Sequence, residues 1–134
     1  MLKQYIPAIK YGNLVAGDEI EAGAVTESNL ASGSTFTRTV TSDGTTAVNV
    51  FTAGAPVACT ITGVTLVAQD TTATNITVEN PASTVVCTIA KGVTAGAVIG
   101  ATTLANTTVA AGAVVIVDGS STGVARVTIT FTKN

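Results

Sequence analysis

Short stretches in which apolar and polar residues alternate follow one another from Thr35 to the end of the chain. Alternation with a period of two indicates a strand with one buried face, and this region has no sustained helical period. β-Branched residues, which suit a half-buried pleated surface, dominate these stretches. We therefore predict strands over residues 35–40, 47–51, 57–69, 75–79, 83–90, 98–99, 107–109, 113–117 and 124–132.

Turn residues separate these strands at regular intervals. The clearest turns are Asp43-Gly44, Gly54-Ala55-Pro56, Asn80-Pro81 and a hairpin loop at Asp118-Gly119-Ser120-Ser121. Gly63 lies inside the longest strand and shifts its phase, which predicts a bulge or bend there. Eight or nine short strands at this spacing predict an all-β fold over residues 35–134: an antiparallel, jelly-roll-like β-sandwich.

The alternation also predicts which side chains face the core. Residues 83–90 direct three side chains inward (Val85, Cys87 and Ile89) and Val86 outward. Residues 124–132 direct four inward, namely Ala125, Val127, Ile129 and Phe131. Residues 113–117 are apolar throughout, which predicts a fully buried strand.

Residues 1–34 differ in composition from the rest and are interpreted as an extended or irregular N-terminal arm. Glycines interrupt any helix longer than two turns, and Ser32-Gly33-Ser34 is typical of a short flexible joint. The tip of the arm is apolar and holds Tyr5, Ile6, Ile9 and Tyr11, a composition typical of interfaces. We expect this tip to bind a partner; the alternative is a disordered or frayed terminus.

Composition excludes several classes of function. The chain has 134 residues, of which 10% are charged, with a net charge of −2 and no histidine. The absence of histidine removes the Ser-His-Asp triad, the usual zinc sites and the commonest general base. Six lysines and arginines leave no basic surface for nucleic acid. We expect no enzyme activity, no cofactor and no metal, and neither a membrane span nor a signal peptide, in a chain made in a cytoplasm.

The remaining polar candidates each have a structural interpretation. Cys59 and Cys87 share the inward phase of their strands, which favours two buried thiols, although a disulfide is the alternative. The acids of the sandwich lie beside turns and are interpreted as solvated turn residues, with a calcium site between loops as the alternative. These acids are Asp43, Asp70, Glu79 and Asp118.

Threonine alternates with other residues at positions 35–39, 60–62 and 128–132. Such ladders bind ordered water in some ice-binding proteins, but we interpret them as a solvent-exposed strand face built from a residue that favours strands. No fixed repeat runs through the chain, as a regular ice-binding solenoid would require.

Arg38 is in phase with Phe36 and Val40, so it faces the same side as their apolar side chains. An arginine in that position lies at the edge of a core or in a subunit contact, and arginine is enriched at interfaces. We predict Arg38 to be a subunit interface residue; the alternative is a residue at the rim with an apolar stem.

The stretch from about Thr41 to Lys133 resembles the small jelly-roll structural proteins of tailed-phage virions, which include capsid decoration (cement) proteins and head-fibre bases. The resemblance is carried by five segments, at residues 42–50, 60–67, 75–78, 109–115 and 127–131. It implies a homotrimer on the outer surface of the capsid that binds the major capsid protein and stiffens the shell. The arm of residues 1–34 would then serve as the anchor.

We therefore expect a virion structural protein that stabilises a phage shell. The alternative is a receptor- or glycan-binding fibre domain of a virion, for which clustered exposed aromatic residues would be expected in the sandwich. An enzyme would need a cleft with paired carboxylates, and no such pair is indicated.

Overall fold

The structure is a computed structural model that describes residues 26–81 and 83–134. The described residues form one turn of 3-10 helix and nine strands. The helix is η2 (Glu27–Asn29), and the strands are β1 (Thr35–Ser42), β2 (Val48–Asn49), β3 (Cys59–Ala68), β4 (Thr74–Glu79), β5 (Val85–Lys91), β6 (Val98–Gly100), β7 (Thr108–Val109), β8 (Ile116–Gly119) and β9 (Ala125–Lys133).

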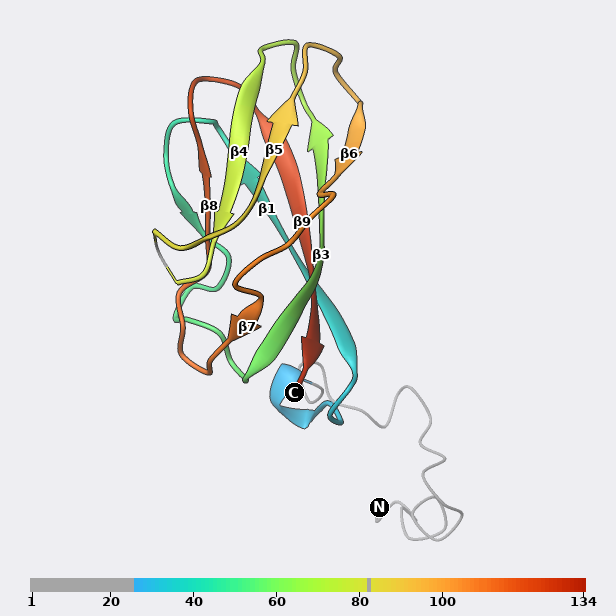
Figure 1. Cartoon of the computed structure of the whole chain (residues 1–134), viewed down its shortest axis with the longest axis vertical. Helices are drawn as coiled ribbons and strands as arrows, with labels where there is room; N and C mark the ends of the chain where they lie inside the picture. Colours follow the sequence, from blue (N-terminus) through green and yellow to red (C-terminus); the bar gives the residue numbers. More distant parts are fainter. Residues whose placement is uncertain (1–25, 82) are drawn as a thin grey trace, which may run out of the picture.

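The strands form two antiparallel sheets that pack face to face (Figure 1). Sheet A has the order β1-β9-β3-β6, with the short β7 also paired to β3, and sheet B has the order β2-β8-β4-β5. The chain crosses from one sheet to the other after β1, β2, β3, β5, β7 and β8. This order is that of two interleaved Greek keys, so the predicted jelly-roll-like β-sandwich is confirmed.

The core lies between the sheets and is built mainly from β-branched residues of the central strands. The four predicted inward residues of β9 are all fully buried, as their alternation requires. Phe131 is the centre of an aromatic stack: its ring centroid lies 5.2 Å from that of Phe36 and 5.2 Å from that of Phe51. These ring contacts stabilise the fold beyond the effect of the apolar area that they bury.

The predicted bulge in β3 is confirmed. Ile61 pairs with Phe131 and Gly63 pairs with Thr130, so Thr62 is an extra residue in β3. The shift keeps apolar side chains facing the core on both sides of the bulge.

Two predictions about individual strands are wrong. Val85 is 46% exposed and Val86 is buried, because the pairing with β4 shifts between Val78 and Glu79 and leaves Val86 as the extra residue. The predicted buried strand at residues 113–117 instead runs from Ile116 to Gly119, and Val114 is exposed. Asp118 and Gly119, predicted as part of a loop, pair with β4.

The two ends of the sandwich differ, as Figure 1 shows. We call the end that carries the β1–β2, β3–β4 and β8–β9 connections the loop end. Backbone segments contact each other directly at the loop end. Gly44 has a φ of +81°, and a Cβ atom added to it would lie 2.1 Å from the carbonyl oxygen of Ser121. Glycine is therefore required at position 44.

We call the opposite end, with η2 and the C-terminus, the arm end. Residues 26–34, the described part of the predicted arm, lie against the last residues of β9 here. The predicted flexible joint is hydrogen-bonded instead: the Gly33 amide donates to the Lys133 carbonyl (2.7 Å), and the Lys133 amide donates to the Ser34 carbonyl (2.8 Å). The arm tip, with Tyr5, Ile6, Ile9 and Tyr11, lies outside the described residues.

Candidate interaction surfaces

Arg38 lies on the inward side of β1, at the open edge of sheet A, as its phase predicted. Its guanidinium lies over two aromatic rings, 5.9 Å from the centroid of Phe36 and 5.5 Å from that of Phe51. These cation–π contacts, with a side chain that is 37% exposed, place Arg38 at the rim of the core. Its predicted role in a subunit interface stays a prediction.

The same guanidinium forms an ion pair with Glu27 in η2. A backbone hydrogen bond at Glu27 holds the pKa of its carboxyl below the ordinary value, and Arg38 acts in the same direction against the effect of burial. Glu27 was not singled out from the sequence. The ion pair attaches the base of the arm to an edge strand of the sandwich.

Lys133 makes a second attachment at the arm end. Its Nζ donates hydrogen bonds to the backbone carbonyls of Ser28 (2.9 Å) and Leu30 (2.7 Å). The hydroxyl of Ser32 also donates to the carbonyl of Asn134. We call Arg38 and Lys133 together the arm clamp, because they hold residues 27–30 against the end of the sandwich.

An ion pair at the loop end between a buried lysine and a partly exposed carboxylate was also missed. Lys91, the last residue of β5, is only 2% exposed, and its Nζ lies 2.5 Å from Oδ1 of Asp70. It also donates to the carbonyls of Asp70 and Thr72, so all three of its donors are used. The position of Lys91 in phase with the buried Cys87 and Ile89 is a signal that could have revealed it.

Asp70 lies in the β3–β4 connection and its side chain is 35% exposed, so its interpretation as a solvated turn residue is correct for its position but misses its structural role. Besides Lys91, it accepts hydrogen bonds from the backbone amides of Val124 (2.8 Å) and Thr72 (3.1 Å). The Lys91 hydrogen bond, followed by those two amides, lowers the pKa of Asp70 to about 2. The carboxylate ties together the β3–β4 connection, the end of β5 and the start of β9.

The outer face of sheet A is covered by threonine. The three threonine runs found in the sequence come from β1, β3 and β9, which are neighbours, and the pairing places them on one side of the sheet. The hydroxyls of Thr39 and Thr128 lie 2.9 Å apart across β1 and β9. The residues on this face are Thr35, Thr37, Thr39, Thr41, Thr60, Thr62, Thr65, Thr128, Thr130 and Thr132, together with Arg126, Val67 and Val98.

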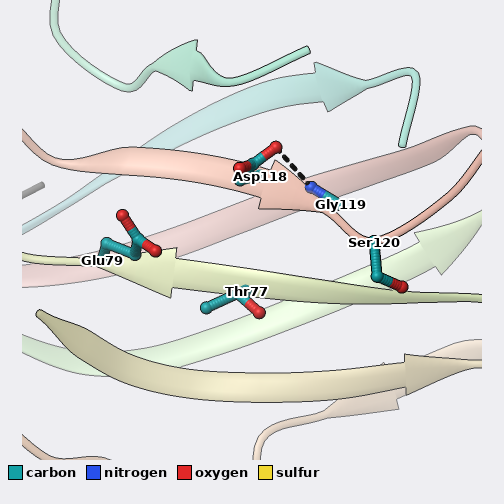
Figure 2. A pocket seen from close by; sticks show the side chains of 5 residues that line it. All are labelled: Thr77, Glu79, Asp118, Gly119 and Ser120. Atoms are coloured by element: carbon teal, nitrogen blue, oxygen red, sulfur yellow. Dashed lines mark hydrogen bonds between the residues drawn. The ribbon is translucent and has the colours of Figure 1, made fainter. Parts of the chain in front are cut away.

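The outer face of sheet B has a shallow pocket of about 110 Å³, lined by Thr77, Glu79, Asp118, Gly119 and Ser120. Figure 2 shows Glu79 on β4 and Asp118 on the neighbouring β8. Oδ1 of Asp118 accepts a hydrogen bond from the Gly119 amide (2.8 Å), and Oε2 of Glu79 accepts one from the Ser83 amide (2.6 Å). Each carboxylate therefore keeps one oxygen without a protein hydrogen bond among the described residues.

The other polar candidates are structural where the structure describes them. Asp43 is an exposed turn residue, as expected, and amides of Thr45 and Thr46 that donate to it lower its pKa. Cys59 and Cys87 are free and buried, which confirms the prediction of two core thiols, and burial raises the pKa of both. Residues 26–81 and 83–134 bring no three metal-ligating side chains together.

A scan against protein-family models and a search of curated proteins both found no match for this chain. Within the described residues, no helix has the length and apolar character needed to cross a membrane.

Proposed function

We propose that this chain is a virion structural protein, a decoration or cement protein that binds the outer surface of a phage capsid and stabilises the shell. The major capsid protein is the proposed partner, and the arm is the proposed anchor. The chain would be made in the host cytoplasm and act on the virion surface as a homo-oligomer, a trimer by the resemblance of its sequence.

The observation that carries this proposal is the arm clamp. Arg38 holds Glu27, and Lys133 holds the carbonyls of Ser28 and Leu30, at the end of the sandwich where the first 25 residues join it. An anchor that bears load needs a firm attachment to the body it holds. Two polar contacts from different strands, β1 and β9, supply that attachment.

Shell stabilisation follows from linkage. A protein that binds only the assembled shell shifts the equilibrium toward assembly, and many weak copies at equivalent positions add their effects. Such a role requires packing surfaces and a rigid fold and no reactive group. The continuous apolar core of this sandwich fits that requirement.

The alternative of a glycan-binding fibre domain has less support. Sugar binding commonly uses exposed aromatic rings, and the aromatic residues among residues 26–81 and 83–134 are Phe36, Phe51 and Phe131. All three are in one stack, with Phe51 and Phe131 buried. No exposed aromatic platform is present in the described residues.

The test is co-sedimentation with shells assembled without this chain. We expect deletion of residues 1–12 to leave the sandwich folded, with an unchanged urea midpoint, and to abolish binding. Replacement of Tyr5, Ile6, Ile9 and Tyr11 by serine should do the same, because the apolar contact is lost.

The matched control replaces polar residues in and next to the same segment, Gln4 and Asn13, by serine, and it should bind as the wild type does. A truncated protein that still sediments with shells would end the proposal that the arm is the anchor. Full-length protein that never sediments with shells would end the proposed function itself.

A further inference from the structure

The two outer faces of the sandwich carry opposite charge. Arg126 is the one charged side chain on the outer face of sheet A among the described residues, and it is exposed. The outer face of sheet B carries Glu79 and Asp118 on adjacent strands, at the pocket of Figure 2. A basic face and an acidic face therefore lie back to back on one domain.

These three charges have no oppositely charged partner within the described part of the chain. The two ion pairs formed there are Arg38–Glu27 and Lys91–Asp70. Arg126 is thus available to bind, and each of the two acids keeps a carboxylate oxygen that no described protein group occupies.

The surroundings of Arg126 are those of an interface. Its row across sheet A contains Thr41, Val67 and Val98, and the Val98 side chain is 68% exposed. The rest of the face is threonine, which offers methyl groups and hydroxyls without charge. An arginine that has exposed apolar residues and few other charges around it is typical of the centre of a protein interface.

We propose that the outer face of sheet A of one copy binds the outer face of sheet B of a second copy, with Arg126 seated in the pocket between Glu79 and Asp118. A planar guanidinium suits two carboxylates, because it can donate hydrogen bonds to both. The same chain carries both halves of the contact, so the occupant is another copy.

The charges also favour this contact over a symmetric contact centred on the same residues. Two sheet A faces centred on Arg126 would oppose one Arg126 to another, and two sheet B faces centred on the pocket would oppose acid to acid, which is repulsive. The contact is therefore head-to-tail, and such contacts form a ring where the rotation closes and an open filament where it does not. This inference goes beyond shell binding, since it concerns the purified chain alone and can fail or hold whether or not the chain binds a capsid.

The experiment measures association of the full chain by analytical ultracentrifugation. We expect the wild type to self-associate, and Arg126→Glu to raise the dissociation constant about tenfold, because an attractive pair becomes repulsive. The double variant Glu79→Lys/Asp118→Lys should weaken association to a similar degree. Mixing the two variants should restore association, since each face again meets the opposite charge.

Restoration on mixing also proves that both variants are folded. Two single substitutions, Arg126→Gln and Ala111→Glu, change the net charge equally, but Ala111 is an exposed turn residue outside both faces, so only the first should weaken association. Wild type that stays monomeric, stronger association of Arg126→Glu, unaffected association of either variant, or no recovery on mixing would each overturn the proposal.

Discussion

The loop end and the arm end of the sandwich each contain an ion pair, and the two pairs differ in the burial of the cation and in what they join. The two carboxylates, Asp70 (35% exposed) and Glu27, are both partly exposed. Lys91 is buried at the loop end and uses all of its donors within the domain. Arg38, 37% exposed, and Glu27, 19% exposed, join the sandwich to the segment that precedes it. The comparison indicates that the loop-end pair joins elements within the domain, whereas the arm-end pair joins the domain to the segment that we propose as its anchor.

Burial explains why the two pairs should respond differently to substitution. A buried charge that loses its partner stays desolvated, whereas water replaces a partner lost at the rim. The arm end can therefore be altered with little cost to folding, and the loop end cannot. Four predictions test this difference, in order of decreasing effect.

The largest effect is expected for Asp70→Asn at the loop end. The ammonium of Lys91 then stays buried without its carboxylate, which should lower the urea midpoint more than the substitutions in the arm clamp or on the outer face of sheet A. Asp43→Asn is the matched control, because the amide oxygen can still accept the turn hydrogen bonds and the residue is exposed. Equal urea midpoints for the two variants would show that the Lys91–Asp70 pair does not support the fold.

Lowering the pH should reveal the contribution of the same residue, Asp70, to stability. The folded state lowers the pKa of Asp70 from 3.8 to about 2, so its contribution is complete above pH 4 and is lost as the pH falls toward 2. The gap between the urea midpoints of the wild type and Asp70→Asn should therefore narrow over that range. A gap that is constant from pH 6 to pH 2 would be inconsistent with an ionised Asp70 as its cause.

A smaller effect is expected for the arm clamp. Arg38→Gln removes a partly exposed ion pair and two cation–π contacts, so we expect a loss of about 1 kcal/mol. Hydrogen exchange at the amides of Asn29 and Leu30 should rise strongly in Arg38→Gln/Lys133→Gln, while amides of β3 keep their protection. A uniform loss of hydrogen-exchange protection across the domain would mean that the arm clamp stabilises the whole fold and not only residues 27–30.

The smallest effect is expected on the outer face of sheet A. Thr39→Val and Thr128→Val together remove one hydroxyl contact and keep the branched shape of both side chains. Stability should change by less than about 0.5 kcal/mol in urea unfolding, as for most surface substitutions. A loss similar to that of Asp70→Asn would mean that the threonine face supports the fold.

Alternation along the chain was sufficient to predict the sandwich, because β3 and β9 bury one face along their length and β1 half-buries one face. The errors arose where pairing between strands decides the outcome. Val86 is buried because β4 and β5 shift register beside it, and Asp118 extends β8 because β4 lies opposite. Both outcomes depend on the pairing with β4, which the sequences of β5 and β8 do not show by themselves.

The candidate surfaces were predicted only in part. The inward phase of Arg38 was correct, but its pairing with Glu27 depends on a turn of the chain eleven residues earlier. The three threonine runs were recognised individually, and only the strand order shows that they share one face. Lys91 was missed because the predicted strand ended one residue before it.

Electron microscopy of particles assembled with and without the chain tests the central claim most directly. The account predicts a density of the size of the sandwich on the outer surface of the shell, with its arm end directed toward the coat protein. Density on the inner surface, no added density, or contact through the loop end would contradict it.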